Sequence, residues 1–98
     1  MGCDIERHGE QIRICGEMTI YDAAAAKGAL LAALQGHIGA CLLDMSQVSE
    51  IDSTGLQLLL MARRSALGRA AAFGVVTPST AVRELLGLLH LNEVIREL

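Results

Sequence analysis

The sequence predicts an α/β domain with a mixed sheet, and three features of the chain support this class. Two alternating segments near the N-terminus are typical of a β-hairpin, which supplies an antiparallel pair of strands. Short apolar runs then alternate with longer segments of helical character, the pattern of parallel strands joined by crossover helices. The expected order is β-β-α-β-α-β-α with a short tail, which gives four to five strands packed by three to four helices.

The N-terminal hairpin is the first expected element. Residues 3–7 and 11–15 alternate between apolar and polar side chains, with residues 8–10 between them. Because successive side chains of a strand point to opposite faces, this alternation predicts a hairpin with one face exposed. We expect the hairpin to end at Gly16-Glu17.

A helix and a buried strand follow the hairpin. Residues 22–34 are rich in Ala and Leu, which favours a helix, with Asp22 as its N-cap and Gly36 as its stop. Residues 39–43 form a short apolar run without alternation, as expected for a strand that is covered on both faces.

A polar stretch separates this strand from the second helix. Residues 44–50 predict a loop, and residues 54–67 predict a helix that Gly68 closes. Residues 54–57 fit a capping box, in which the hydroxyl of Thr54 is followed three positions later by Gln57.

The C-terminal part continues the alternation. Residues 71–76 predict a strand, and a third helix runs from a cap at Ser79 or Thr80 to about residue 86. Residues 91–98 fit either a last short strand or a helical turn.

Composition narrows the class of protein. The 98 residues predict a single domain, residues 1–98, and a content of 52% hydrophobic and 19% charged residues argues against disorder. The formal charge of −3, the 2% of aromatic residues and the absence of a basic cluster larger than Arg63-Arg64 argue against nucleic-acid binding. The sequence shows no apolar run of membrane-spanning length and no secretory signal pattern, so no membrane insertion is expected.

The three cysteines fit no metal or redox motif. Their number is odd and their spacing is irregular, and Cys15 and Cys41 lie within apolar runs, where we expect small core side chains; Cys3 is the third. This usage predicts a reduced, cytoplasmic location.

Ser53 stands where the polar stretch meets the second helix. Asp, Ser and Thr before a helix are ordinary N-cap residues, so Asp52, Ser53 and Thr54 have a structural explanation. The same position also suits modification, because a phosphate on Ser53 would meet free backbone N–H groups and the positive end of the helix dipole. Both interpretations are compatible, and they favour a switch over a catalyst.

Enzymatic sites fit the sequence less well. Neither Ser53 nor Ser46 lies in the Gly-x-Ser-x-Gly motif of a hydrolase nucleophile. An aspartic protease needs Gly directly after the Ser or Thr and two facing carboxylates, whereas Thr54 follows Ser53 here and the Asp-Ser-Thr-Gly segment occurs once. No glycine-rich phosphate-binding motif occurs. The histidines are expected on the surface: His8, His37 and His90. We therefore predict no catalytic residue and no cofactor.

Two further features have a structural and a functional interpretation. A divalent cation bound by Asp44, Glu50 and Asp52 is conceivable, but a polar loop is favoured, and no metal site is predicted. Residues 56–62 are almost entirely apolar, which is typical of a buried helix, although part of this surface could contact a partner.

The chain resembles a stand-alone STAS domain of the type found in bacterial anti-sigma factor antagonists. The resemblance covers essentially the whole chain and is carried by four segments: Gly16-Glu17-Met18, Leu43-Asp44-Met45-Ser46, Ile51-Asp52-Ser53-Thr54-Gly55-Leu56 and Leu85-Leu86-Gly87-Leu88-Leu89. It implies a STAS-type mixed sheet and a non-enzymatic role in protein binding.

The resemblance also implies a site and its partners. In that family the serine after the aspartate is phosphorylated by an anti-sigma factor with serine-kinase activity, so Ser53 is the expected acceptor and a phosphatase the expected second partner. The unphosphorylated form binds the kinase, which frees a sigma factor. The expected partner-binding residues are Thr19, Asp52, Ser53, Thr54, Gly55 and Leu56.

One position departs from the family pattern. Thr19 stands where members often carry Asp, and the following residues 20–23 resemble STAS proteins encoded with chemotaxis systems. The chain is also similar to the small STAS subunit of lipid-transport ABC transporters. The alternative to the switch is therefore a non-enzymatic adaptor in a chemosensory complex or in such a transporter.

Overall fold

The computed structural model describes residues 2–35 and 39–91. Within these residues the elements follow the predicted order: β1 (Cys3–His8), β2 (Gln11–Met18), α1 (Ala23–Leu34), β3 (Cys41–Ile51), α2 (Ser53–Gly68), β4 (Phe73–Val75) and α3 (Thr80–Leu88).

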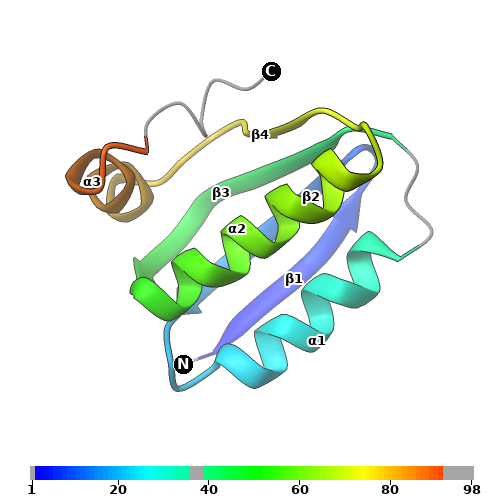
Figure 1. Cartoon of the computed structure of the whole chain (residues 1–98). Coiled ribbons are helices and arrows are strands. Elements are labelled where there is room, and N and C mark those ends of the chain that lie inside the picture. Colours follow the sequence, from blue (N-terminus) through cyan, green and yellow to red (C-terminus); the bar gives the residue numbers. More distant parts are fainter. Residues whose placement is uncertain (1, 36–38, 92–98) are drawn as a thin grey trace.

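The described strands form one mixed sheet in the order β1-β2-β3-β4. β1 pairs antiparallel with β2, whereas the β2–β3 and β3–β4 pairs are parallel. Figure 1 shows α1 and α2 side by side across one face of the sheet, while α3 lies apart from them next to β3. The prediction of an α/β class with a mixed sheet is confirmed.

The core lies between the sheet and the layer formed by α1 and α2. In β2, Ile12 and Ile14 are fully buried, and the alternate residues Gln11 and Arg13 are exposed, so one face of the hairpin meets solvent as predicted. The two helices bury one stripe each against this face, with these residues: Ala26, Leu30, Leu34, Leu56, Leu58, Leu59, Ala62 and Ala66.

The strand β3 is much longer than the sequence predicted, and the expected loop over 44–50 is wrong. β3 continues to Ile51 because β2 also continues past Gly16 to Met18 and pairs with it as far as Ile51, with register shifts between Arg13 and Cys15 and between Gly16 and Glu17. The alternation expected of a strand is broken here, since Met45 and Val48 are buried while both Ser46 and Gln47 between them are exposed. The break lies where the register shifts, because β3 has one residue more than β2 between the pairs Arg13–Asp44 and Cys15–Gln47.

The helix starts also differ from expectation. Asp52, not Thr54, is the N-cap of α2, so the predicted capping box is wrong. Asp22 precedes α1 as predicted but makes no side-chain capping hydrogen bond. Of the two candidates at α3, Ser79 is the cap, and its hydroxyl accepts a hydrogen bond of 3.2 Å from the backbone N–H of Val82.

Several smaller expectations can be compared with the structure. Cys41 is buried as predicted, whereas Cys15 is only half-buried. His8 and His90 are exposed, as expected. The expected stop at Gly36, the position of His37 and the interpretation of residues 92–98 lie outside the described residues.

A buried carboxylate ties the connection between β4 and α3 to the sheet. Asp44 is 8% exposed, and its Oδ1 accepts hydrogen bonds from the Thr77 hydroxyl at 2.6 Å and from the Ser46 hydroxyl at 2.8 Å. Its Oδ2 accepts a bond of 3.2 Å from Nε of Arg13. The Thr77 bond, followed by the Ser46 and Arg13 bonds, holds the pKa of the Asp44 carboxyl well below its usual range despite burial.

This network helps to place α3. The segment after β4 runs along β3, where the backbone N–H of Val76 donates to the Leu43 carbonyl and that of Ser79 to the Met45 carbonyl. α3 then packs on β3, burying Val82 and Leu86. The position of α3 therefore depends on β3 and not on the layer of α1 and α2.

We predict that Asp44→Asn reduces stability and its dependence on acid pH. The folded-state pKa lies below the unfolded value of about 4, so the ionised carboxylate stabilises the fold above that pH, and this contribution is lost as the pH falls toward the folded-state pKa. At neutral pH the loss should be about 1–3 kcal/mol. Urea unfolding followed by circular dichroism at several pH values measures both effects.

The matched control is Asp4→Asn, an exposed carboxylate in β1. It should leave the pH dependence of the unfolding free energy as in the wild type. If the free energy of unfolding depends on pH in the same way in the wild type and in Asp44→Asn, the prediction is wrong.

Candidate functional site

The carboxylate of Asp52 joins two segments at one end of the sheet. Its Oδ1 accepts hydrogen bonds from the backbone N–H groups of Thr54 at 2.9 Å and Gly55 at 3.1 Å, which caps α2. Its Oδ2 accepts a bond of 3.0 Å from the N–H of Ile20, in the connection between β2 and α1. The bonds from Gly55, Ile20 and Thr54 lower the pKa of Asp52, so this side chain is a carboxylate at neutral pH.

The first turn of α2 lies directly against the end of β2. A Cβ atom added to Gly55 would collide with the carbonyl oxygen of Met18 and would lie 2.9 Å from Cγ1 of Ile51. In addition, the backbone N–H of Asp52 donates a hydrogen bond of 3.2 Å to the same Met18 carbonyl. The glycine at this position therefore permits a close approach that no other residue type allows.

Ser53 is the first residue of α2 and is exposed. Because Asp52 accepts the capping hydrogen bonds, the Ser53 side chain has no part in them, and its hydroxyl forms no hydrogen bond with any described residue. The hydroxyl lies at the positive end of the helix dipole. Its surroundings combine easy access with a fixed backbone.

The other predicted binding residues fall into two groups. Thr19 and Thr54 are half-buried, and Thr19 lines a groove together with Asp52. Gly55 and Leu56 are buried, with Leu56 only 8% exposed in the core. Those two residues hold the site in place from beneath, while Thr19, Thr54 and Ser53 lie nearer its surface.

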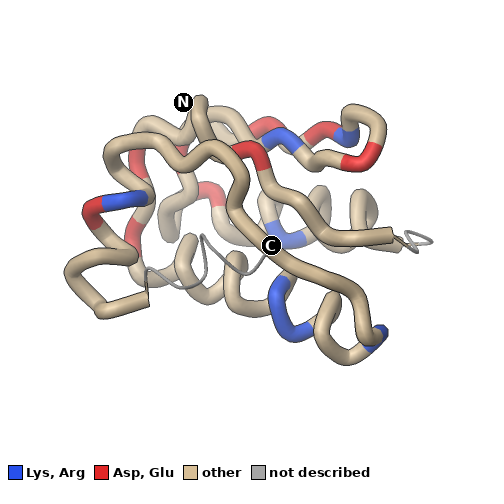
Figure 2. Tube along the Cα trace, turned by 90° about the horizontal axis from the view of Figure 1, so that it is seen from above, with Lys and Arg blue, Asp and Glu red and all other residues tan. Residues whose placement is uncertain are grey.

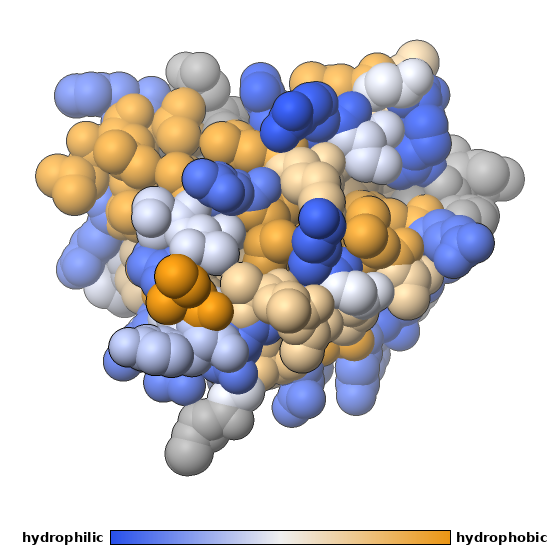
Figure 3. All heavy atoms as spheres, turned by 60° about the horizontal axis from the view of Figure 1, so that its bottom comes forward, coloured by the Kyte–Doolittle hydropathy of each residue, from blue (hydrophilic) through white to orange (hydrophobic). Residues whose placement is uncertain are grey.

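Sequence reasoning did not single out the exposed apolar residues at this end of the molecule. Ile20 is 65% exposed, Tyr21 92% and Leu88 76%. On the face that Figure 3 brings forward, apolar patches lie between hydrophilic residues. Two adjacent large side chains directly after a strand, Ile20 and Tyr21, could have indicated an exposed apolar surface from the sequence. The exposure of Leu88 could not be predicted, because it depends on where α3 lies.

The carboxylates of the described residues do not form a metal site. No group of three or more His, Cys, Asp or Glu in the described ranges is arranged to hold a metal ion. Asp44 and Asp52, two members of the conceivable cation site, each accept hydrogen bonds from the protein instead. Among the helices of residues 2–35 and 39–91, none has the length and hydrophobicity needed to cross a membrane.

The fold and the site define a small α/β domain in which an exposed serine begins a helix. A family model described as "Mlab, STAS domain" matches residues 1–97, and the chain belongs to this STAS domain family. The predicted family is confirmed. No curated protein matches the sequence.

Solved structures show the same fold. The anti-sigma factor antagonist SpoIIAA in its unphosphorylated form is 22% identical, with a TM-score of 0.73 over 95% of this chain and 84% of that one. The Bacillus cell fate determinant SpoIIAA in the phosphorylated form is 21% identical, with a TM-score of 0.68 over 95% of this chain and 87% of that one.

We predict that Gly55→Ala destabilises the fold by about 1–3 kcal/mol, because the added methyl group must displace backbone or Ile51. Gly28→Ala in α1 is the control, since nothing lies within 4 Å of its added Cβ. There the substitution should stabilise the helix by about 0.5–1 kcal/mol. Urea unfolding of both variants tests this, and equal effects of the same sign would show that the close approach is unimportant.

Proposed function

We propose that this STAS domain is a phosphorylation-controlled protein-binding switch of the anti-sigma factor antagonist kind. In its unphosphorylated form it binds a cognate serine kinase that acts as an anti-sigma factor. Phosphorylation of Ser53 ends this binding, and a phosphatase restores it. The domain itself is not an enzyme, and it works in the cytoplasm with proteins, not nucleic acid or membrane, as partners.

The observation that carries this proposal is the division of roles between Asp52 and Ser53. Asp52 supplies the cap, so the exposed Ser53 hydroxyl can be modified without removing a hydrogen bond on which the helix depends. A serine that capped its own helix would be poorly available to a kinase. Likeness to SpoIIAA structures in unphosphorylated and phosphorylated forms supports the same interpretation.

A phosphate at Ser53 should leave the fold intact and disturb an interface. It adds about −1.5 to −2 charges at neutral pH, and the helix N-terminus stabilises such a charge. At an interface the same charge lies next to the ionised Asp52, and it must lose its hydration there unless the partner supplies a cation. The switch therefore acts on the contact with the partner and not on the folding of the domain.

The expected contact residues surround this serine. Thr19, Thr54 and the exposed Ile20 and Tyr21 lie within the segments that Asp52 joins, and they form the proposed surface together with Ser53. Gly55 and Leu56 support that surface from the core.

The second candidate is a constitutive adaptor in a chemosensory complex or a lipid-transport ABC transporter. The large exposure of Ile20, Tyr21 and Leu88 favours it, since such residues suit a permanent interface. In this case Ser53 would be an exposed helix residue without a regulatory role.

We predict that Ser53→Ala retains the partner and Ser53→Asp loses it. Both proteins serve as baits in a pull-down from the native host, with captured proteins read by mass spectrometry. We expect the Ala form to capture a GHKL-type kinase. The Asp form should capture less of it, by about tenfold or more, because the new charge is desolvated next to Asp52. Phosphate on Ser53 in protein isolated from the host completes the test.

The matched control is Ser65→Asp, which adds the same charge to an exposed position farther along α2. It should behave like the wild type. Equal capture of transporter or chemosensory proteins by the Ala and Asp baits would contradict the switch and favour the adaptor.

A further inference from the structure

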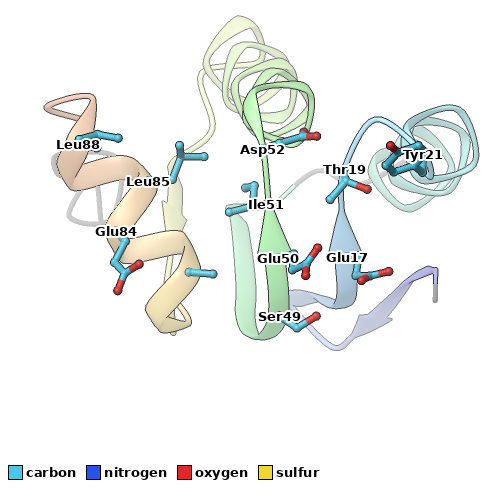
Figure 4. Close-up of a pocket in the computed structure, with 11 residues that line it drawn as sticks. Glu17, Thr19, Tyr21, Ser49, Glu50, Ile51, Asp52, Glu84, Leu85 and Leu88 are labelled. Carbon is cyan, nitrogen blue, oxygen red and sulfur yellow. The ribbon is translucent and has the colours of Figure 1, made fainter.

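A groove of about 760 Å³ lies beside the proposed switch surface, between α3 and the ends of β2 and β3. Figure 4 shows its residues spread over these elements, with Leu85 and Leu88 on α3, Ile51 and Asp52 at the end of β3, and Tyr21 on the far side. α3 packs mainly on β3, and the groove lies along the side of α3 that faces the ends of β2 and β3. Ser53 is not among the residues that line it.

The wall formed by α3 is apolar. Leu85 and Ile51 are half-buried and point toward the space between α3 and β3, and Leu88 is 76% exposed at the end of the helix. Val82 and Leu86 on the same helix anchor it to the core and the half-buried Leu85 packs against that core as well, whereas Leu88 is largely exposed. An exposed leucine beside a groove with an apolar wall is typical of a surface that a partner covers.

The charge around this apolar wall has one sign. Among the described residues that line the groove there is no Lys or Arg. Four carboxylates line it: Glu17, Glu50, Asp52 and Glu84. Glu17 and Glu50 are direct partners in the parallel register of β2 and β3, so two acidic side chains meet at the rim. Arg83 precedes Glu84 on α3 but is not among the residues that line the groove, and Figure 2 shows a basic position next to an acidic one.

From this combination we infer that the groove docks a basic amphipathic helix of a partner protein. Its apolar side would contact Ile51, Leu85 and Leu88, and its Lys or Arg side chains would lie near Glu50 and Glu84. A helix with side chains is about 10–12 Å wide, which suits an open groove of this size. Charge complementarity favours a basic occupant over an acidic one and makes binding dependent on salt.

This docking is compatible with both states of Ser53. It rests on the proposed function in one respect, namely that a protein binds at this end of the domain. A phosphate on Ser53 lies outside the groove, and its negative charge does not repel a basic helix. The groove therefore serves both forms of the domain. It would keep the kinase, or the phosphatase that acts on the phosphorylated form, close while contact at Ser53 is made or broken.

The test uses the full chain, labelled with ¹⁵N, and a synthetic helical peptide with leucines on one face and lysines on the other. Chemical-shift changes should cluster at Glu50, Ile51, Glu84, Leu85 and Leu88, and affinity should fall as salt rises. We expect Glu84→Lys and Leu88→Ser each to weaken binding by about tenfold. Ser53→Asp should leave binding intact or strengthen it, because it adds a negative charge next to Asp52.

Matched controls lie elsewhere on the surface. Glu10→Lys reverses an exposed charge in the hairpin turn, and Leu67→Ser removes a leucine that is 52% exposed on α2. Both should bind the peptide within about twofold of the wild type. A peptide with glutamates in place of lysines should not bind.

Several outcomes would overturn the inference. The first is an equal loss of peptide affinity in Glu84→Lys and Glu10→Lys. The others are chemical-shift changes centred outside the groove, absence of peptide binding to the wild type, and loss of peptide binding in Ser53→Asp. A dimer of the full chain that Glu84→Lys dissociates would assign the groove to a second copy instead. Failure of Ser53 to accept phosphate in the host leaves the peptide result unchanged, so the two proposals fail separately.

Discussion

The hydrogen bonds of the Asp52 carboxylate are the interaction on which the functional end of this domain depends. One oxygen caps α2 through the N–H groups of Thr54 and Gly55, and the other holds the N–H of Ile20 in the connection from β2 to α1. A single ionised side chain thus fixes two segments that are separated in the sequence. It also releases Ser53 from the capping role, which leaves the hydroxyl exposed on a rigid backbone.

Two features of the sheet bring Asp52 to this position. The pairing of β2 with β3 continues to Met18 and Ile51, so both strands end together. Gly55 then allows the first turn of α2 to approach the Met18 carbonyl closely. If the strands ended at different heights, the carboxylate could not reach Ile20 and cap the helix at the same time.

The sequence was sufficient for the order of elements, the mixed sheet and the family, because these follow from hydrophobic periodicity and distinctive motifs. The extent of β3 was not predictable, since its polar residues become strand only through pairing with β2. The capping residue was equally hard to predict: Asp52, Ser53 and Thr54 are all good capping residues, and only the structure shows that the Asp52 carboxylate accepts the capping hydrogen bonds. The groove depends on where α3 lies, which the Asp44–Thr77 contact helps to set.

The separation between Ser53 and the groove has a consequence for regulation. If one surface supplied all of the binding energy, phosphorylation strong enough to release the kinase would also keep away the enzyme that removes the phosphate. A domain with a phosphate-sensitive contact at Ser53 and a phosphate-insensitive groove along α3 avoids this conflict. In this proposal the contact at Ser53 sets whether the complex is productive, and the groove, with its leucines and carboxylates, sets which proteins come near.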